Sequence, residues 1–515
     1  MWNFNPPPRA GGLLIAILIA VTSLAIAAFS SSSNTPHNHN PNHTHSLLTP
    51  LLSTTAQILL PNTPEFNLLL AHRWSSNPLN TPPKPSLIVI PTTESDVAQT
   101  IRHANAHNLP FLATTGGHGT TTRLSTFPRN DGGVLIYLRN LTKFELAPDG
   151  QTAVLGGGLL TGEVVRALWR AGKQTTTGIC SCVSFVGPAL GGGHGFLQGR
   201  FGLVADQVLG GRVVLGDGEV VDLLDTDRED LFWGLRGAGH NFGVVSQLTV
   251  RVYDVVEEKR EWAYEVFTFT GERLEEVYKV AEGIVETQTA DMMHWSVWAM
   301  DVDVDPDKPV ILFTVVYNGP MADCQKYTHA LHAASPAAYL SGVTEYPNLP
   351  MLLGADVDGP NCKPTGTAMV RAADVVDYDI DALRNWYDIF SDTVATEKGL
   401  AKSICLLEGY SVQAVQAVPA ASTAFPHRRQ RLLLAPFIQY DVGNSTLDAI
   451  AERWGDAMET AAFGGSERRT YVNYAHGHES LQALYGYEPW RLQKLQALKR
   501  KYDPENRFRF YAPIV

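Results

Sequence analysis

The sequence predicts an α+β fold built from two lobes. Between residues 81 and 255, short β-rich runs alternate with stretches of helical periodicity, which is the pattern of an α+β lobe. From residue 256 to about residue 470 the apolar runs lengthen and predict strands of one sheet, with helices between them. The chain has 515 residues, of which 44% are hydrophobic and 18% charged, so it can bury a large core in each lobe.

Four β-rich runs supply the expected strands of the first lobe: Leu87–Ile90, Gly133–Leu138, Ala153–Leu155 and Arg212–Leu215. A Rossmann fold is not expected, because no Gly-x-Gly-x-x-Gly opens a helix directly after a strand. The nearest candidate, Gly191–Gly195, follows Pro188, and the residues around that proline lack the pattern of a strand.

The second lobe is expected to be an antiparallel sheet backed by helices. Its strands are predicted at His294–Met300, Val310–Tyr317, Ser403–Glu408 and Leu432–Tyr440. Helical stretches lie between them at Glu272–Gln288 and Ile380–Thr393.

The charge pattern argues against a nucleic-acid-binding protein. The net charge is −12, whereas phosphate binding depends on clustered Lys and Arg. The one basic stretch, Lys494–Lys501, carries Leu492, Leu495, Leu498 and Tyr502 at helical spacing, which predicts a helix with a solvated basic face.

Residues 1–29 have the pattern of a signal peptide or a signal anchor. Arg9 precedes an apolar run over residues 13–29, which is longer than the usual signal core and close to the ~18–20 residues that span a bilayer. Ala25-Ile-Ala27 is a candidate cleavage site, so cleavage and membrane anchoring through residues 13–29 both remain open. Either alternative predicts the secretory pathway. Residues 30–80 are expected to form a polar stalk over Ser30–Ser46 and a lead-in to the first lobe.

Three N-glycosylation triplets agree with secretion. They begin at Asn42, Asn140 and Asn444.

Two reactive side chains are framed by glycines. His118 stands in Gly116-Gly-His-Gly119, and Cys180 in Gly178-Ile-Cys-Ser-Cys-Val183, which leads into the glycines of residues 187–195. Glycine lets the backbone turn tightly and approach a flat ligand closely, because it has no Cβ. An imidazole and a thiol in such loops can reach one aromatic cofactor from two sides.

Several further motifs accompany these loops in order along the chain: Leu87–Ala98, Gly202–Gln207 with Asp206, Val213–Gly218, Asp230–Val245, Tyr471–Tyr474 and Lys501–Phe508. Together they resemble the berberine-bridge-enzyme-like branch of the vanillyl-alcohol-oxidase flavoproteins. The resemblance implies a two-subdomain PCMH-type FAD-binding domain over residues 81–255 and a substrate domain over residues 256–470. It also implies a C-terminal segment, residues 471–515, that packs back on the FAD lobe.

The resemblance also implies how FAD is held. His118 is expected to bond to the 8α-methyl of the isoalloxazine ring and Cys180 to its C6. The other residues expected to bind the cofactor are Gly116, Gly117, Gly119, Val183, Gly187, Gly192, Gly193, Gly195, Asn241, Gly243 and Asn473. The chain departs from the family at Thr114 and Thr115, where an arginine or serine often precedes the Gly-Gly-His motif.

Five cysteines must be placed in an oxidising compartment. If Cys180 is bonded to flavin, the remaining four, Cys182, Cys324, Cys362 and Cys405, can form two disulfides, and the sequence does not say which. No metal site is expected, because Cys180 and Cys182 are spaced too closely for a usual metal pair and no histidine cluster accompanies them.

Tyr474 and Gln439 are the expected catalytic residues. Tyr474 matches the second tyrosine of the family's Tyr-x-Asn-Tyr motif and is expected to take the substrate proton, provided that a cation or the flavin lowers its pKa from about 10. Gln439 stands where relatives carry a catalytic Glu or Gln and, being an amide, would orient the substrate. Tyr471 either assists or packs in the core. Val183 matches a position that gates oxygen access, and a small residue there implies an oxidase.

These expectations describe an FAD-dependent oxidase that removes a hydride and a proton from a small organic molecule and reduces O2 to H2O2. The aromatic and Met side chains of the second lobe favour an aromatic or polyketide-like secondary metabolite: Trp295, Trp298, Met300, Tyr410 and Tyr440. An oligosaccharide oxidase and a non-catalytic flavin-binding secreted protein are the alternatives.

Overall fold

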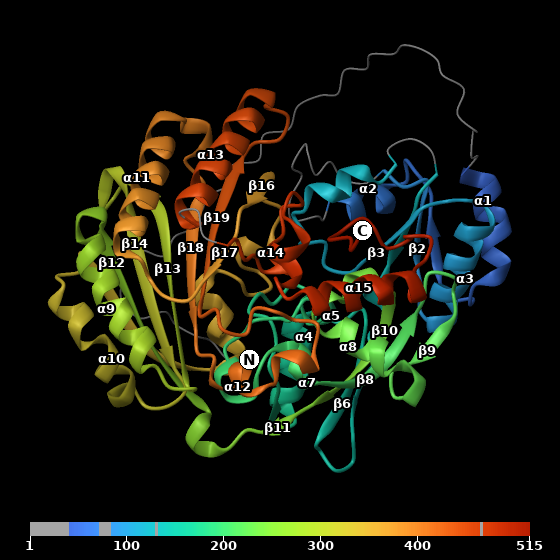
Figure 1. Ribbon diagram of the computed structural model, residues 1–515, viewed down its shortest axis with the longest axis horizontal. Helices are drawn as coiled ribbons and strands as arrows, with labels where there is room; N and C mark the ends of the chain where they lie inside the picture. Colours follow the sequence, from blue (N-terminus) through green and yellow to red (C-terminus); the bar gives the residue numbers. More distant parts are fainter. Residues whose placement is uncertain (1–40, 72–83, 129–131, 464–466) are drawn as a thin grey trace, which may run out of the picture.

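The computed structural model describes residues 41–71, 84–128, 132–463 and 467–515 (Figure 1). Two lobes lie side by side, and the C-terminal segment runs across the first of them. The predicted signal peptide or anchor, residues 1–29, and the first part of the stalk lie outside the described residues. Among the described helices, none has the length and apolar character needed to span a bilayer.

The first lobe contains two main sheets. One has the order β1 (Gln57–Leu59), β2 (Leu87–Ile90), β4 (Val134–Tyr137), β3 (Phe111–Thr114), with β2 and β3 parallel to β4. The other is antiparallel, in the order β5 (Phe144–Leu146), β6 (Thr152–Gly156), β10 (Val244–Arg251), β8 (Val208–Val214), β9 (Val220–Asp222). A short pair joins β11 (Tyr253–Asp254) to β7 (Lys173–Gln174).

Helices surround these sheets: α1 (Pro41–Leu48), α2 (Pro64–Ala71), α3 (Glu94–Ala106), α4 (Thr161–Arg170), α5 (Val186–Leu190), α6 (Gln198–Phe201), α7 (Val204–Gln207) and α8 (Glu229–Ala238). Helix α3 begins after Pro91-Thr-Thr because Thr93 caps it. The Thr93 hydroxyl accepts from the Asp96 amide, and the Asp96 carboxylate accepts from the Thr93 amide in return. These bonds place the first β-α unit of the lobe as the sequence indicates.

The predicted stalk is wrong for its last residues, and the lobe begins before residue 81. Residues 41–46 belong to α1 rather than to an extended linker. Leu48 at its end is fully buried against Ile101 and Val134, and β1 adds an antiparallel strand to β2. The burial of this apolar side chain and the pairing of β1 explain why this segment is ordered onto the lobe.

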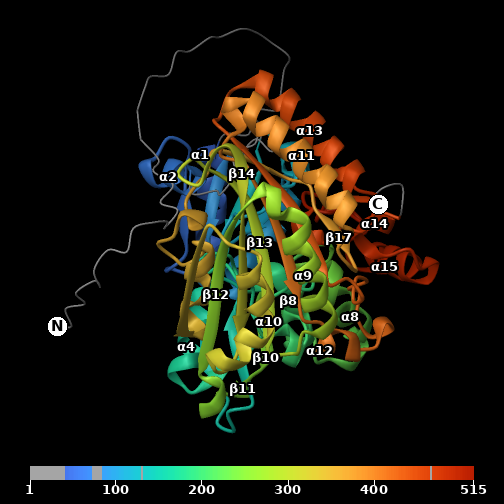
Figure 2. The same cartoon turned by 90° about the vertical axis from the view of Figure 1, so that its left-hand side faces the viewer.

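The second lobe is one eight-stranded antiparallel sheet, as predicted. Its order is β15 (Ala338–Glu345), β12 (Glu261–Thr270), β14 (Asp305–Tyr317), β13 (Met292–Asp301), β18 (Ile404–Tyr410), β19 (Leu432–Tyr440), β16 (Thr367–Val370), and β17 (Ala373–Val375) also pairs with β19. Figure 2 shows helices over one face: α9 (Leu274–Thr287), α10 (Met321–Ala333), α11 (Ile380–Thr396) and α13 (Ser445–Phe463). The short α12 (Gln413–Ala417) packs on α6 of the first lobe.

The C-terminal segment packs on the first lobe, which confirms that part of the predicted fold. Helices α14 (Leu481–Tyr485) and α15 (Pro489–Tyr502) share an apolar core with α8 (Figure 1). The Asn241 amide nitrogen donates to the Ala512 carbonyl, and the Ile514 amide donates to the Asn241 side-chain oxygen. The basic face of α15 is only partly solvated, because Lys499 is buried and donates to Asp503.

A kink in α8 gives a test of the packing between the lobes. Gly237 has φ = 138°, and a Cβ there would overlap the backbone of Phe425. We expect Gly237→Ala to lower the free energy of unfolding by about 3 kcal/mol, measured by chemical denaturation. The control is Gly283→Ala in the exposed middle of α9, where a Cβ meets no atom within 4 Å. That change is expected to stabilise by about 0.5–1 kcal/mol. Equal stabilities of the two variants would contradict the interpretation.

Candidate active site

The described part of the chain encloses a cavity of about 480 Å³ where the two lobes and the C-terminal segment meet. The first lobe contributes the loops that follow β3 and that precede α5. The second lobe contributes residues of β18 and β19, and the C-terminal segment contributes Tyr471, Asn473, Tyr474, Arg507, Phe508, Phe510 and Tyr511. A cavity of this size between domains, with mainly apolar walls, is typical of a ligand or cofactor site.

The loop after β3 places His118 in the cavity wall. Gly117 has φ = 71°, a conformation that favours glycine. A Cβ on Gly116 would lie 2.8 Å from the Cys182 carbonyl oxygen, so this loop packs directly on the loop that carries Cys180. Burial lowers the pKa of His118 to about 4, and the imidazole is therefore neutral at pH 7 and a competent nucleophile.

The second predicted attachment residue lies beside the first. One ligand atom of His118 and the Sγ atoms of Cys180 and Cys182 all lie within 4.8 Å of one another. Cys180 is a free thiol in the cavity wall, and burial raises its pKa to about 11. Although this trio has the spacing of metal ligands, Cys182 is bonded in a disulfide, so the trio lacks the thiolate that a metal would need there.

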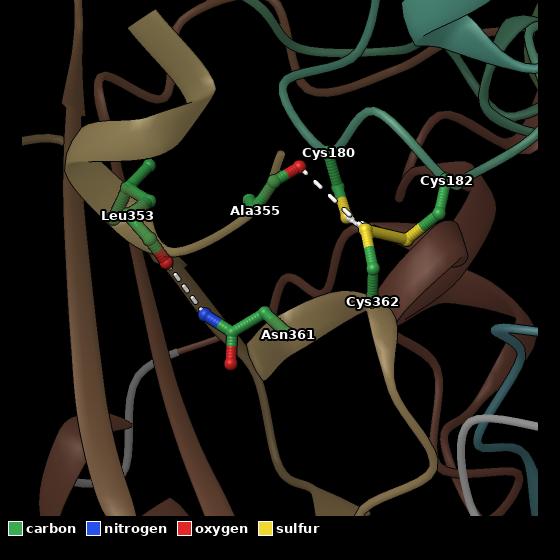
Figure 3. The surroundings of a disulfide bond; sticks show 6 residues. All are labelled: Cys180, Cys182, Leu353, Ala355, Asn361 and Cys362. Atoms are coloured by element: carbon green, nitrogen blue, oxygen red, sulfur yellow. Dashed lines mark hydrogen bonds between the residues drawn. A yellow bond between two sulfur atoms is a disulfide. The ribbon is translucent and has the colours of Figure 1, made fainter. Parts of the chain in front are cut away.

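The structure contains one disulfide within the described residues, not two. Cys182 is bonded to Cys362, so the bond joins a loop of the first lobe to the loop after α10 and β15 in the second lobe (Figure 3). Cys324 of α10 and Cys405 of β18 are free thiols, so the two disulfides that the sequence allows are not both formed. Both are fully buried in the apolar core between the sheet and its helices, where they pack as small apolar side chains.

Most residues expected to bind the cofactor line the cavity. Besides His118 and Cys180, they are Gly116, Gly117, Gly119, Val183, Gly187, Gly243 and Asn473.

Four others do not line the cavity: Gly192, Gly193, Gly195 and Asn241. A Cβ would lie 2.6 Å from Phe425 at Gly192 and 2.6 Å from Val204 at Gly193, and at Gly195 it would overlap the Thr177 carbonyl. These glycines therefore serve packing within the protein. Asn241 is buried and anchors the C-terminal segment through the hydrogen bonds described above.

Asp206, from a motif of the resemblance, also lies away from the cavity wall. Its carboxylate is buried against Arg428, with Nη2–Oδ1 at 2.8 Å and Nη1–Oδ2 at 3.0 Å. This ion pair joins α7 of the first lobe to the segment before β19.

The alternation of side chains along β18 and β19 builds the opposite wall of the cavity. In β18, Ile404, Leu406, Glu408 and Tyr410 line the cavity, whereas Cys405 and Leu407 face the helices. In β19, Phe437 and Gln439 line the cavity, whereas Ile438 and Tyr440 face the helices. A period of two is what a strand between two packed layers requires. Gln439 therefore lies where the sequence predicts it.

Glu408 is a carboxylate that the sequence reasoning missed. Its Oε1 accepts from the Tyr410 hydroxyl at 2.7 Å, and its Oε2 accepts from the Tyr474 hydroxyl at 3.1 Å. Burial raises the pKa of Glu408 to about 7, although the two hydroxyls partly oppose this shift. The available signal was an acidic residue ending an otherwise apolar strand, Ile404-Cys-Leu-Leu-Glu408.

Tyr474 lies in the cavity wall as predicted, but its surroundings differ from those expected. Burial and the neighbouring Glu408 raise its pKa well above the ordinary value, and this carboxylate takes the place of the cation that was expected to lower it. Tyr474 is therefore protonated at neutral pH and can pass a proton only if Glu408 receives one.

Tyr471 and Asn473 hold helix α5 and the loop between α5 and α6. The Asn473 side-chain nitrogen donates to the Pro188 carbonyl and to the Tyr471 hydroxyl, and the Tyr471 hydroxyl accepts from the Gly193 amide. His240 approaches the Asn473 side-chain oxygen at 3.0 Å. Tyr471 therefore positions this loop, in addition to lining the cavity.

Most aromatic residues cited for an aromatic substrate do not reach the cavity. Of Trp295, Trp298, Met300, Tyr410 and Tyr440, only Tyr410 lines it. Trp298 and Tyr440 face the helices, on the other side of the sheet. The apolar wall comes instead from other side chains of the second lobe: Leu353, Val370, Ile404, Leu406 and Phe437.

Comparisons with known proteins agree with this architecture. A family model described as "FAD binding domain" matches residues 85–224, and one described as "Berberine and berberine like" matches residues 470–515. The FAD-linked oxidoreductase chyH of Penicillium rubens is 36% identical over 475 residues, which cover 91% of this chain and 93% of the relative. The FAD-linked oxidoreductase chry5 of Gibberella zeae is 35% identical over 490 residues, 92% of this chain and 95% of the relative.

Solved structures share the fold at lower identity. Physcomitrella patens BBE-like 1 has a TM-score of 0.75 and 23% identity, covering 92% of this chain and 98% of that one. Berberine bridge enzyme from Eschscholzia californica has a TM-score of 0.75 and 18% identity, covering 90% and 97%.

The two sheets of the first lobe, the helix-backed antiparallel sheet and the returning C-terminal segment define a PCMH-type FAD-dependent oxidoreductase. The cavity suits this cofactor, because its apolar walls meet a glycine loop and two nucleophilic side chains. The chain belongs to the berberine-bridge-enzyme-like family of FAD-linked oxidoreductases.

Proposed function

We propose that this protein is an oxidase that holds FAD covalently through His118 and Cys180. The observation that carries the proposal is the position of both nucleophiles, within 4.8 Å of each other, in the wall of one cavity. The neutral imidazole of His118 is ready to form a bond, whereas the thiol of Cys180, whose pKa is raised, must lose its proton as it reacts. When bound, the flavin accepts a hydride from the substrate and passes two electrons on.

Glu408 receives the substrate proton in this proposal, and Tyr474 relays it. The substrate hydroxyl donates to the Tyr474 oxygen while the Tyr474 hydroxyl gives its proton to Glu408 Oε2, 3.1 Å away. A carboxylate with a pKa of about 7 is well matched to a general base at neutral pH. Gln439 orients the substrate from the neighbouring strand, and the small side chain of Val183 leaves room for O2, whose reduction gives H2O2.

The substrate is proposed to be a small aromatic or polyketide-like secondary metabolite. The wall around Glu408 is formed by Leu406 and Phe437 together with Leu353 and Val370, which favour an apolar, planar molecule. The main alternative is an oligosaccharide, since carbohydrate oxidases are among the proteins of the same fold. Peroxide released with oligosaccharides but not with aromatic alcohols would favour that alternative.

The flavin linkage is tested on denaturing gels of wild type, His118→Ala, Cys180→Ala and the double variant, viewed under ultraviolet light after acid treatment. We expect fluorescence to migrate with the wild type and with each single variant, and to be lost from the double variant. Loss in His118→Ala alone would restrict the attachment to His118. A wild-type chain that takes up no FAD would overturn the proposal, and flavin that no substrate reduces would favour a non-catalytic flavin-binding protein.

We also propose that the protein enters the secretory pathway and carries N-glycans. The side chains of Asn140 and Asn444 are exposed, as acceptors must be, and Asn42 lies in α1. Digestion with an N-glycosidase should increase the mobility of the secreted protein.

A further inference from the structure

Three sulfur atoms, those of Cys180, Cys182 and Cys362, are clustered together (Figure 3), and Cys180 lines the cavity. Cys180 Sγ lies 3.4 Å from Cys182 Sγ and 3.7 Å from Cys362 Sγ, so a free thiol touches both halves of the disulfide that joins the lobes. Elsewhere in the described chain the free thiols are Cys324 and Cys405, in the core behind the sheet. Only at this cluster does a free thiol meet the disulfide.

We propose that these residues form a thiol–disulfide exchange site, in which Cys180 replaces Cys182 as the partner of Cys362. The sulfur of Cys180 attacks the sulfur of Cys362, the Cys180–Cys362 bond forms and the Cys182–Cys362 bond breaks. The electron pair of the broken bond goes to Cys182, which takes up the proton that Cys180 releases. One disulfide and one thiol are present before and after, so no external oxidant or reductant is consumed.

The choice of Cys362 as the target follows from the connections of the two loops. A bond from Cys180 to Cys362 keeps the first lobe joined to the second, whereas a bond from Cys180 to Cys182 would close a ring over a single residue and release Cys362. The backbones of the two loops are already held together, because the Ser181 amide donates to the Ala355 carbonyl at 2.8 Å. The exchange needs Cys180 to approach Cys362 by about 1.6 Å, from contact to bonding distance, and to swing into line with the Cys362–Cys182 bond, because its Sγ lies beside both sulfur atoms of that bond.

The consequence for the cofactor rests on the function proposed above. Cys180 cannot bond to flavin while it is bonded to Cys362, and once bonded to flavin it can no longer exchange. Attachment of flavin through Cys180 would thus fix the Cys182–Cys362 bond. Burial keeps Cys180 protonated, since its pKa is raised to about 11, and this limits how fast the exchange proceeds in the empty site.

The exchange of disulfide partners also affects the substrate side of the cavity. Asn361, next to Cys362, lines the cavity and donates to the Leu353 carbonyl at 2.6 Å (Figure 3). Ala355, whose carbonyl accepts from Ser181, lines it as well. Whether Cys362 is bonded to Cys182 or to Cys180 therefore sets the position of this part of the cavity wall.

The test compares the full-length variants Cys182→Ser and Cys182→Ser/Cys362→Ser. Peptide mapping without reduction identifies the disulfides, and the absorbance of the denatured protein measures the sulfur-linked flavin. In Cys182→Ser exposed to glutathione disulfide, which serves as the two-electron oxidant, we expect a Cys180–Cys362 disulfide and at least about a tenfold fall in sulfur-linked flavin. In the double variant Cys180 has no cysteine partner, so the sulfur–flavin bond should return. A map of Cys182→Ser with Cys362 as a free thiol, or with Cys180 on flavin, would overturn the exchange.

A second measurement, on the wild-type protein, tests the proposal if these variants do not fold. Wild-type protein made under riboflavin limitation is denatured in acid, and its free thiols are then alkylated. In the flavin-free fraction, some molecules should carry the alkyl label on Cys180 and others on Cys182. Label on Cys180 alone would overturn the proposal. If the flavin proves to be attached through His118 only, the second tether in the proposed function fails. The disulfide map and the alkylation pattern still decide the exchange.

Discussion

Replacing Glu408 by Gln is expected to slow substrate-driven flavin reduction by about 10²–10⁴-fold. The amide keeps the size of the side chain between Tyr410 and Tyr474 but cannot receive the proton that Tyr474 passes on. In the wild type, the pKa of about 7 means that the carboxylate predominates above pH 7 and the acid below it. The reduction rate should therefore fall as the pH drops through about 7, and Glu408→Gln should lack this step. Stopped-flow measurement of flavin absorbance over pH 5–9 would show both effects.

The matched control is Glu265→Gln. Glu265 is also buried in a strand of the second lobe, but its partners are Thr328 and His332 of α10, and it does not line the cavity. This variant should keep the wild-type rate and pH profile. A Glu408→Gln enzyme with an unchanged rate and profile would remove Glu408 from the mechanism and return the proton to another acceptor.

Arg428→Met is expected to lower the free energy of unfolding by about 3–5 kcal/mol. Arg428 and Asp206 are about 4% and 5% exposed and form two hydrogen bonds, so removing the cation leaves a buried carboxylate without its charge partner. Because the pair joins the two lobes, both lobes should unfold in one transition, and the denaturant concentration at its midpoint should be lower than in the wild type.

Lys402→Met provides the comparison. Lys402 pairs with Asp441 at 3.4 Å on the surface, with 59% and 91% of the two side chains exposed. Exposed pairs of this kind contribute little, so the stability should hardly change. Similar losses in the two variants would show that burial is not what makes the Arg428–Asp206 pair important.

Hydrophobic periodicity predicts much of the fold, because local pattern and tertiary packing agree. The predicted strand Leu87–Ile90 has the same bounds as the observed strand β2. The predicted helix Ile380–Thr393 is only a few residues shorter than the observed helix α11. The glycine loops around His118 and Cys180 likewise place both residues on one cavity.

The features that the sequence did not reveal depend on contacts between distant residues. The raised pKa of Glu408 arises from burial beside Tyr474, 66 residues away in the chain. The Cys182–Cys362 bond spans 180 residues, and nothing in the spacing of the cysteines distinguishes it from other pairings. Gly192, Gly193 and Gly195 are predicted to bind the cofactor, whereas the structure needs them for packing against Phe425, Val204 and Thr177 respectively.

The C-terminal segment also sets a temporal order on cofactor binding. Arg507, Phe508, Phe510 and Tyr511 form part of the cavity wall beside the loop of His118, and Arg507 donates to the Leu109 carbonyl across 398 residues. The ribosome synthesises His118 long before Arg507, so the loop of His118 is made while this part of the wall is still missing. The binding site is therefore complete only when this segment has been synthesised and has packed beside the loop of His118. A chain truncated before residue 507 would therefore present an open, apolar half-site in place of a closed pocket.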